Sequence, residues 1–260
     1  MKYKLKDQHT FYNGRKLHRI EALKDIDTMN VLKGDLGGFV ESENNLSQEG
    51  DCWIFHDAMV YHNARVYENA SVFHDAKVFD DAKVFGKSII SDDANIFGSA
   101  QINKLSYVSG QAKVYDNAIV TDYSNIRSDA EVFGNAKIFH SHIEVGSKIF
   151  GNATLKNRSY IRESKISSNQ TFKGIYLNNA QILHENQCSI IYLKFLDEYL
   201  YSYIKRNQIT YTLNNTNYNS REFIAYIKNN SSPYYDHRRE LLDIITLNEI
   251  KFKAEYNFLS

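Results

Sequence analysis

Four of the nine histidines have spacings that could support acid–base chemistry. His56 and His74 are 18 residues apart, and His140 and His142 are separated by one residue. An imidazole titrates near neutral pH, so it can take a proton from a hydroxyl or amine that attacks a substrate. These four residues are the candidate general bases, and the alternative is that each is a solvated residue at a turn.

Signals for other reactive sites are weak. The sequence lacks three common motifs: the phosphate-binding Gly-x-x-x-x-Gly-Lys-Ser/Thr, the nucleophile-presenting Gly-x-Ser-x-Gly and the zinc-binding His-Glu-x-x-His. Cys52 and Cys188 are too far apart for a metal-ligand motif and too few for a disulfide framework. We therefore expect no metal site and two packed free thiols.

The charge balance disfavours two classes of partner. Lys and Arg total 31 and Asp and Glu total 31, so the 260-residue chain has no net charge. A nucleic-acid-binding protein usually has a basic excess, which this chain lacks. No run of 18 apolar residues occurs, and the first ten residues do not form a signal peptide. We expect a cytoplasmic protein with neither a nucleic acid nor a membrane as partner.

A six-residue repeat dominates the middle of the chain. An aliphatic residue recurs every six residues from Ile54, and four residues after it comes a small one such as Ala58 or Ala64. Asp and Asn, which tolerate left-handed turn conformations, are frequent just before the small residue. Later steps shorten to five residues, from Ile138 to Ile143, Ile161 to Ile166, Phe172 to Leu177 and Leu177 to Ile182.

This period predicts a β-solenoid. The aliphatic and small residues point to the same side of a short strand, with a corner every six residues. Three strands form a triangular coil of 18 residues, and successive coils stack by parallel pairing about 4.8 Å apart. The prism has a first face beginning at Ile54, a second at Val60 and a third at Val66. We expect seven to eight coils over residues 46–187.

The flanking segments predict caps for the open ends of the stack. Asn13-Gly14 between strand-like residues predicts a hairpin, so residues 1–45 are expected to form a small β cap. After residue 187 the apolar spacing becomes helical, which predicts helices near 189–206, 220–229 and 236–255. Residues 188–260 are therefore expected to form a helical domain.

One outward column of the predicted prism is aromatic. On the second face, the residue after each aliphatic position is an aromatic in six consecutive coils: Tyr61, Phe79, Phe97, Tyr115, Phe133 and Phe150. The corresponding columns of the other two faces are mixed. A continuous apolar strip marks an interface. The interpretations are a subunit interface, a surface covered by the C-terminal domain, a site for a foreign protein, or stacking that only rigidifies the sheet.

The repeat resembles the hexapeptide repeat of left-handed parallel β-helices, which many acyltransferases contain. Residues 52–187 carry this pattern, and Gly34–Trp53, GDLGGFVESENNLSQEGDCW, is similar to a segment of bacterial and phage hexapeptide-repeat proteins labelled acyl- or acetyltransferases. The resemblance implies left-handed coils, a histidine general base and coenzyme A in a groove between subunits. The chain departs from that family in having no inserted loop over a coil junction.

Two functions follow as hypotheses. The first is a non-enzymatic, oligomeric protein-binding scaffold, a dimer or trimer, encoded by a phage or mobile element and acting on a host protein. It requires no cofactor, and the aromatic face or the C-terminal helices would hold the partner. The alternative is an acyltransferase that uses coenzyme A and a histidine base at His140, His142, His56 or His74.

Overall fold

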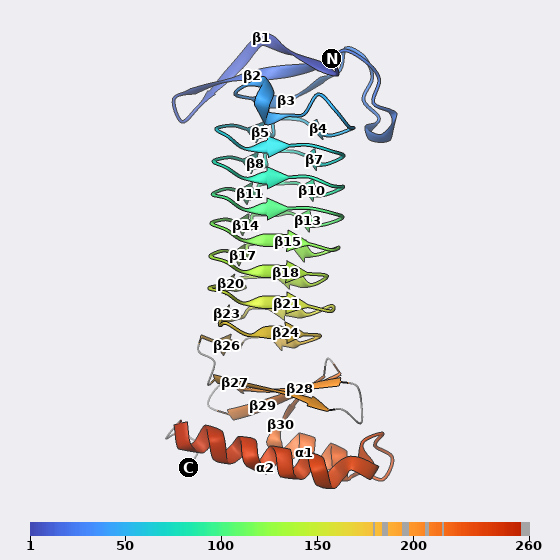
Figure 1. The fold of residues 1–260 in the computed structure, drawn as a ribbon, viewed down its shortest axis with the longest axis vertical. Helices are drawn as coiled ribbons and strands as arrows, with labels where there is room; N and C mark the ends of the chain where they lie inside the picture. Colours follow the sequence, from blue (N-terminus) through green and yellow to red (C-terminus); the bar gives the residue numbers. More distant parts are fainter. Residues whose placement is uncertain (179, 184–186, 194–197, 206–207, 215, 256–260) are drawn as a thin grey trace.

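The computed structural model describes residues 1–178, 180–183, 187–193, 198–205, 208–214 and 216–255. Its centre is a parallel β-solenoid of about eight coils (Figure 1). An antiparallel hairpin lies at one end of the solenoid, and a sheet with two helices lies at the other. With the N-terminus at the top of Figure 1, the chain descends from the second face at the left across the front to the first face at the right. That path is a left-handed winding.

Three parallel sheets form the faces of the solenoid. The first face contains β4 (Trp53–Ile54), β7 (Ser71–Val72), β10 (Ile89–Ile90), β13 (Tyr107–Val108), β16 (Asn125–Ile126), β19 (His142–Glu144), β22 (Tyr160–Arg162) and β25 (Tyr176–Asn178). The second contains β3 (Leu36–Val40), β5 (Met59–Val60), β8 (Lys77–Val78), β11 (Asn95–Ile96), β14 (Lys113–Val114), β17 (Glu131–Val132), β20 (Lys148–Phe150), β23 (Lys165–Ser167) and β26 (Gln181–Ile182). The third contains β6 (Arg65–Val66), β9 (Lys83–Val84), β12 (Gln101–Ile102), β15 (Ile119–Thr121), β18 (Lys137–Phe139), β21 (Thr154–Lys156) and β24 (Thr171–Lys173).

The six-residue pattern forms the core as expected. The inward aliphatic and small residues, for example Val78, Ala82 and Ile96, are completely buried. Each buried Val or Ile contributes about 1.5–3 kcal/mol through removal of apolar surface from water. The parallel register continues through the five-residue steps, since Ile143 pairs with Ile126 and Ile182 pairs with Ile166. The shortened turns therefore keep the side chains in register.

The first coil begins earlier than the predicted boundary at residue 46. β3 already pairs in parallel with β5, with Val40 opposite Val60, and Leu46 bridges Val66. Two extra residues between Leu46 and Ile54 hid this coil from the six-residue pattern. Glycine is needed in β3 because a Cβ at position 37 would lie 2.6 Å from the Ile54 carbonyl oxygen.

The N-terminal hairpin is confirmed. β1 (Tyr3–Tyr12) and β2 (Arg15–Ala22) pair antiparallel around Asn13 and Gly14, which have φ values of 49° and 75°. These positive angles suit a two-residue turn with the twist of the flanking strands. β2 also pairs with β3, so the hairpin extends the second face. Two short 3-10 helices, η1 (Asp27–Met29) and η2 (Glu43–Asn45), complete the cap.

The predicted helix at 189–206 is wrong. The chain instead forms a four-stranded antiparallel sheet of β27 (Cys188–Leu193), β28 (Glu198–Lys205), β29 (Gln208–Leu213) and β30 (Thr216–Asn219). Leu196, part of the predicted helical stripe, lies outside the described residues. Buried Tyr201 and Tyr203 belong to the solenoid core, whereas buried Leu200 belongs to a second core. Burial on both faces produced an apolar run without the alternation typical of a half-exposed strand.

The two remaining helices agree with the predictions. α1 (Ser220–Lys228) begins at Asn219, whose side chain accepts the Glu222 backbone N–H while the Glu222 carboxylate accepts the Asn219 N–H. η4 (Tyr235–His237) precedes α2 (Arg238–Glu255), and both helices pack on the far side of the sheet (Figure 1). No helix among the described residues is long and apolar enough to cross a membrane.

Candidate functional site: an aromatic ladder on the second face

The six predicted aromatic residues form one continuous stack, here called the aromatic ladder. From Tyr61 through Phe79, Phe97, Tyr115 and Phe133 to Phe150, successive ring centroids are 5.1, 4.9, 4.7, 4.8 and 4.9 Å apart, with interplanar angles of at most 5°. In-register parallel pairing places equivalent residues one strand spacing apart, so the backbone imposes this stacking.

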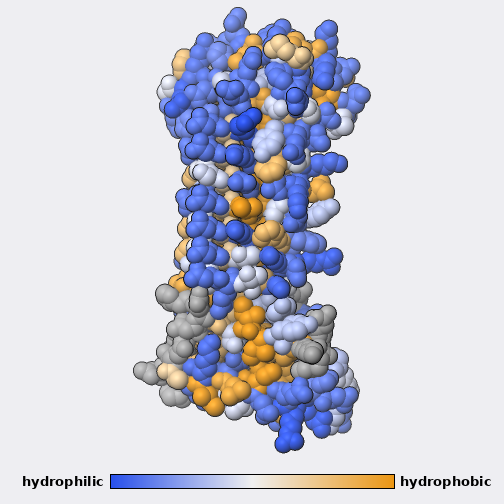
Figure 2. Space-filling model, in the orientation of Figure 1, coloured by the Kyte–Doolittle hydropathy of each residue, from blue (hydrophilic) through white to orange (hydrophobic). Residues whose placement is uncertain are grey.

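Among the described residues, only the second face has a long aromatic stack. Stacking on the first face joins Phe55 to Phe73 and, near the other end, Tyr160 to Tyr176. On the third face, Tyr67 stacks on Phe85, and Asn103 follows in the next coil. Figure 2, which views the third face, shows a mainly hydrophilic solenoid surface with hydrophobic side chains gathered over the C-terminal domain. The aromatic ladder thus distinguishes one face of the prism.

The chain covers one end of the ladder. Tyr61 is 3% exposed because it packs with Leu17 and Phe39, and its ring lies 5.6 Å from that of Tyr12 near the hairpin turn. Rings from Phe79 to Phe150 are half-buried. The C-terminal domain stacks on the last coil and does not lie along this face (Figure 1). The prediction that this domain could cover the strip is therefore wrong for the described residues.

The packing of the rings limits what can bind there. Parallel rings with centroids near 4.8 Å are offset-stacked, so neighbouring rings occupy much of each ring face. A sugar or nucleobase that stacks on an aromatic ring needs a free ring face. A ladder that presents mostly ring edges suits the apolar side chains of another protein better.

His56 and His74 lie at adjacent coils of one corner and stack on each other. Their ring centroids are 4.9 Å apart, and their φ values are 53° and 58°. The backbone nitrogen of His74 lies 3.3 Å from the Nδ1 atom of His56. The backbone nitrogen of Asp92 likewise lies 3.4 Å from the Nδ1 atom of His74. Each imidazole therefore accepts a backbone N–H one coil away. This contact stabilises the corner, and a role as general base stays a prediction.

His140 and His142 lie where the chain passes from the third face to the first. His140 has φ 43° and its ring centroid is 5.9 Å from that of Tyr123, whereas His142 begins β19. Partial burial, with help from the nearby Arg127 cation, lowers the pKa of His142. Its imidazole is therefore neutral at pH 7 and able to accept a proton. No hydrogen bond joins the two imidazoles, so they do not form a catalytic pair.

A histidine–carboxylate pair that the sequence analysis missed lies at the corner beside the ladder. The Nδ1 atom of His62 is 2.8 Å from Oδ1 of Asp80, which is 18 residues later at the same corner. The pair lines a groove of about 620 Å³ together with Arg15 and Glu41. Although burial alone raises the pKa of Glu41, the His62 backbone N–H and the Arg15 guanidinium hold it below its ordinary value. The 18-residue column was the signal that could have found this pair.

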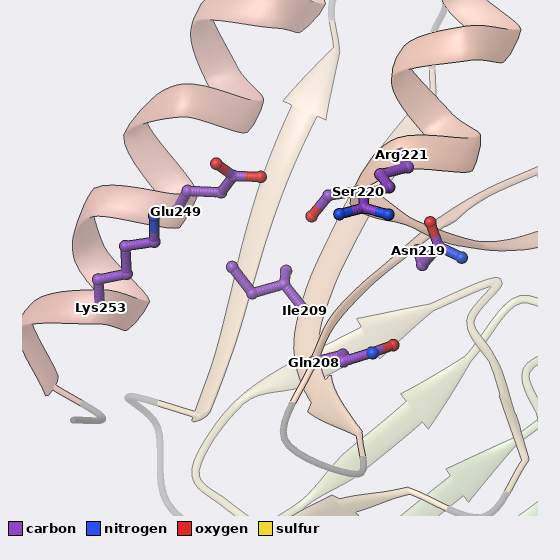
Figure 3. A pocket seen from close by; sticks show the side chains of 7 residues that line it. All are labelled: Gln208, Ile209, Asn219, Ser220, Arg221, Glu249 and Lys253. Atoms are coloured by element: carbon purple, nitrogen blue, oxygen red, sulfur yellow. The ribbon is translucent and has the colours of Figure 1, made fainter. Parts of the chain in front are cut away.

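A second cavity lies in the C-terminal domain, away from every predicted site residue. Its volume is about 480 Å³, and it opens between the start of α1 and the end of α2. Figure 3 shows Ser220 and Arg221 opposite Glu249, with Ile209 between them.

Within the part of the chain that the structure describes, no group of three or more His, Cys, Asp or Glu side chains could hold a metal ion. A comparison with protein-family models and with curated proteins finds no match to this chain.

Proposed function

We propose that the protein is a non-enzymatic scaffold that self-associates and binds protein through the aromatic ladder on its second face. The observation that carries the proposal is the ladder from Phe97 to Phe150, which is stacked and half-buried and lies beyond the hairpin cluster of Leu17, Phe39 and Tyr61. Continuous apolar strips on a folded surface mark interfaces with other proteins. The absence of inserted loops between Ile54 and Ile182 leaves the face flat.

Rigidity also supports this proposal. The rings are positioned by paired strands and by one another, so they lose little conformational entropy when a partner covers them. The ring stack and the flat sheet would supply a preorganised apolar surface, and the flanking charged residues would form its polar rim.

Replacement of Phe97 by Lys tests the proposal. We expect Phe97→Lys to weaken self-association at least about tenfold, because a charge in a desolvated apolar contact is costly. Phe85→Lys is the matched control, since Phe85 has the same repeat position and is also stacked, but on the third face. Molar mass is measured by light scattering over a range of concentrations, and circular dichroism checks the fold. A wild-type monomer at all concentrations, or equal effects of both substitutions, would refute the proposal.

The second candidate function is coenzyme A-dependent acyl transfer. The His62–Asp80 pair in its groove favours this candidate, because a carboxylate that binds Nδ1 orients the imidazole and leaves Nε2 to accept a proton. Calorimetric titration with coenzyme A tests it, with His62→Gln and His142→Gln as variants. Acyl transfer requires binding heat and loss of turnover in one of them. No heat at saturating coenzyme A would eliminate this candidate.

A further inference from the structure

Charged residues flank the aromatic ladder in an ordered way. Two residues before the ring, the outward position of the second face holds Lys77, Asn95, Lys113, Glu131 and Lys148 in successive coils. At the corner after the ring, the coil of Lys77 holds Asp80 and Asp81, and the coil of Lys113 holds Asp116. The coils of Asn95 and Glu131 have Gly, Ser or Asn at this corner instead. In two of the three lysine coils, those of Lys77 and Lys113, aspartate therefore occurs on the opposite side of the ladder, whereas the coil of Lys148 has Gly and Asn there.

This arrangement is complementary to itself. A two-fold axis that runs along the solenoid through the aromatic ladder places the lysine side of one copy over the aspartate corner of the other, at the same height. Lys113 of each copy then faces Asp116 of the other. An antiparallel pairing about a two-fold axis along the strands places this column opposite its own copy, and in the register centred on Lys113 the lysines face one another, which is repulsive.

We propose that the occupant of the aromatic ladder is a second copy of this chain, aligned parallel and in register. The proposal rests on the proposed function, because it names the partner of the same face. Charge complementarity selects the alignment, and the rings supply the apolar contact. Asp116 is available for this contact because its Oδ2 atom accepts the Gly134 N–H at the corner while its carboxylate remains exposed.

The size of the surface predicts a weak dimer. The ladder beyond the hairpin cluster, from Phe97 to Phe150, spans three coil steps, about 14 Å, and each coil contributes two outward side chains. A strip this short buries less than the roughly 800 Å² per partner of a standard stable interface. We therefore expect dissociation in the micromolar range and a molar mass that rises with concentration.

Charge reversal tests the contact. Lys113→Asp and Asp116→Lys each place like charges opposite each other, so we expect each to weaken dimerisation about tenfold or more. An equimolar mixture should regain wild-type affinity, because both contacts in the heterodimer are complementary. Lysine fits this corner, since Lys104 occupies an equivalent position with φ 57°. Lys83→Asp, which changes the same repeat position on the third face, is the control and should have no effect.

Distances between spin labels test the alignment separately. Labels at Leu32→Cys and Leu247→Cys lie near opposite ends of the molecule, and native Cys52 and Cys188 are buried. A parallel dimer makes the 32-to-32 distance shorter than the 32-to-247 distance between copies, and an antiparallel dimer reverses this order. Monomers at all concentrations would overturn both proposals. A dimer insensitive to charge reversal, or with the antiparallel order, would overturn the parallel alignment while the scaffold function stands.

Discussion

The solenoid and the C-terminal domain follow different rules, although they share one chain. In the solenoid each strand from β4 onward is two or three residues long and pairs with the equivalent residues of the adjacent coils. In the C-terminal domain, β28 is eight residues long and pairs antiparallel with both β27 and β29. Every coil of a repeat has the same surroundings, so the sequence of one six-residue unit predicts the structure of the others. β28 has surroundings that no other strand shares, so no repeated pattern predicts its structure.

The difference teaches that burial on both faces removes the signal that identifies a strand. Tyr201 and Tyr203 pack against the end of the solenoid, and Leu200 packs with the helices. The sheet is therefore a layer between two separate cores. A half-exposed strand would have alternated polar and apolar residues, whereas this one resembles the stripe of a buried helix.

Charges placed in the two cores should have the largest effect and should separate the two regions. Val114→Asp places a carboxylate in the fully buried solenoid core, and we expect it to cost more than about 4 kcal/mol and to prevent folding. Leu241→Asp changes a fully buried residue of the second core. We expect it to unfold α1 and α2 while the solenoid remains folded. Limited proteolysis and near-ultraviolet circular dichroism distinguish these outcomes. Complete unfolding of Leu241→Asp would show that the two regions form one cooperative unit.

Glycine substitutions should have an intermediate effect that depends on coil stacking. Gly98 has φ 63°, and a Cβ there would lie 2.8 Å from the Asp116 backbone nitrogen of the next coil. Gly14 has φ 75°, but a Cβ there meets no atom within 4 Å. We expect Gly14→Ala to cost about 1 kcal/mol through backbone strain, and Gly98→Ala to cost about 2–3 kcal/mol because the stacked backbones must also separate. Urea denaturation measures both. Equal costs would show that the close approach between coils contributes nothing.

Alkaline titration should give the smallest effect, with one tyrosine reporting on each region. Burial, assisted by Glu131, raises the pKa of Tyr115 in the ladder to about 12, and burial, assisted by Glu198, raises that of Tyr234 in the C-terminal domain to about 12. Because each folded-state pKa exceeds the ordinary value of 10.0, the stability from these groups is complete below pH 10 and is lost as the pH rises towards 12.

Phenylalanine substitutions check this assignment. Tyr115→Phe should reduce the alkaline loss of thermal stability in the solenoid, and Tyr234→Phe should reduce it in the C-terminal domain. Thermal melts from pH 8 to about pH 11 provide the measurement. Identical pH profiles for the wild type and both variants would contradict the predicted linkage.

Sequence periodicity predicted one part of the candidate site and not the others. The aromatic ladder followed directly from the repeat, because residues in the same repeat position are stacked by the register. The His62–Asp80 pair also lies in one column, but its members are 18 residues apart and belong to no catalytic motif of adjacent residues. Cover of Tyr61 by the hairpin, through Tyr12 and Leu17, depends on the path of β1 and β2, and no local pattern encodes it.

The sequence by itself determined the solenoid, the hairpin, the capped helix α1 and the aromatic ladder. Each depends on residues whose partners lie at a short or regular offset: 18 residues for most coils and 17 or 16 for the later ones, two for the turn and three for the capping box. Tertiary structure alone decided the early first coil, the four-stranded sheet and which rings remain uncovered. Those features depend on contacts at irregular separations, where burial by a neighbouring layer outweighs the local preference of the chain.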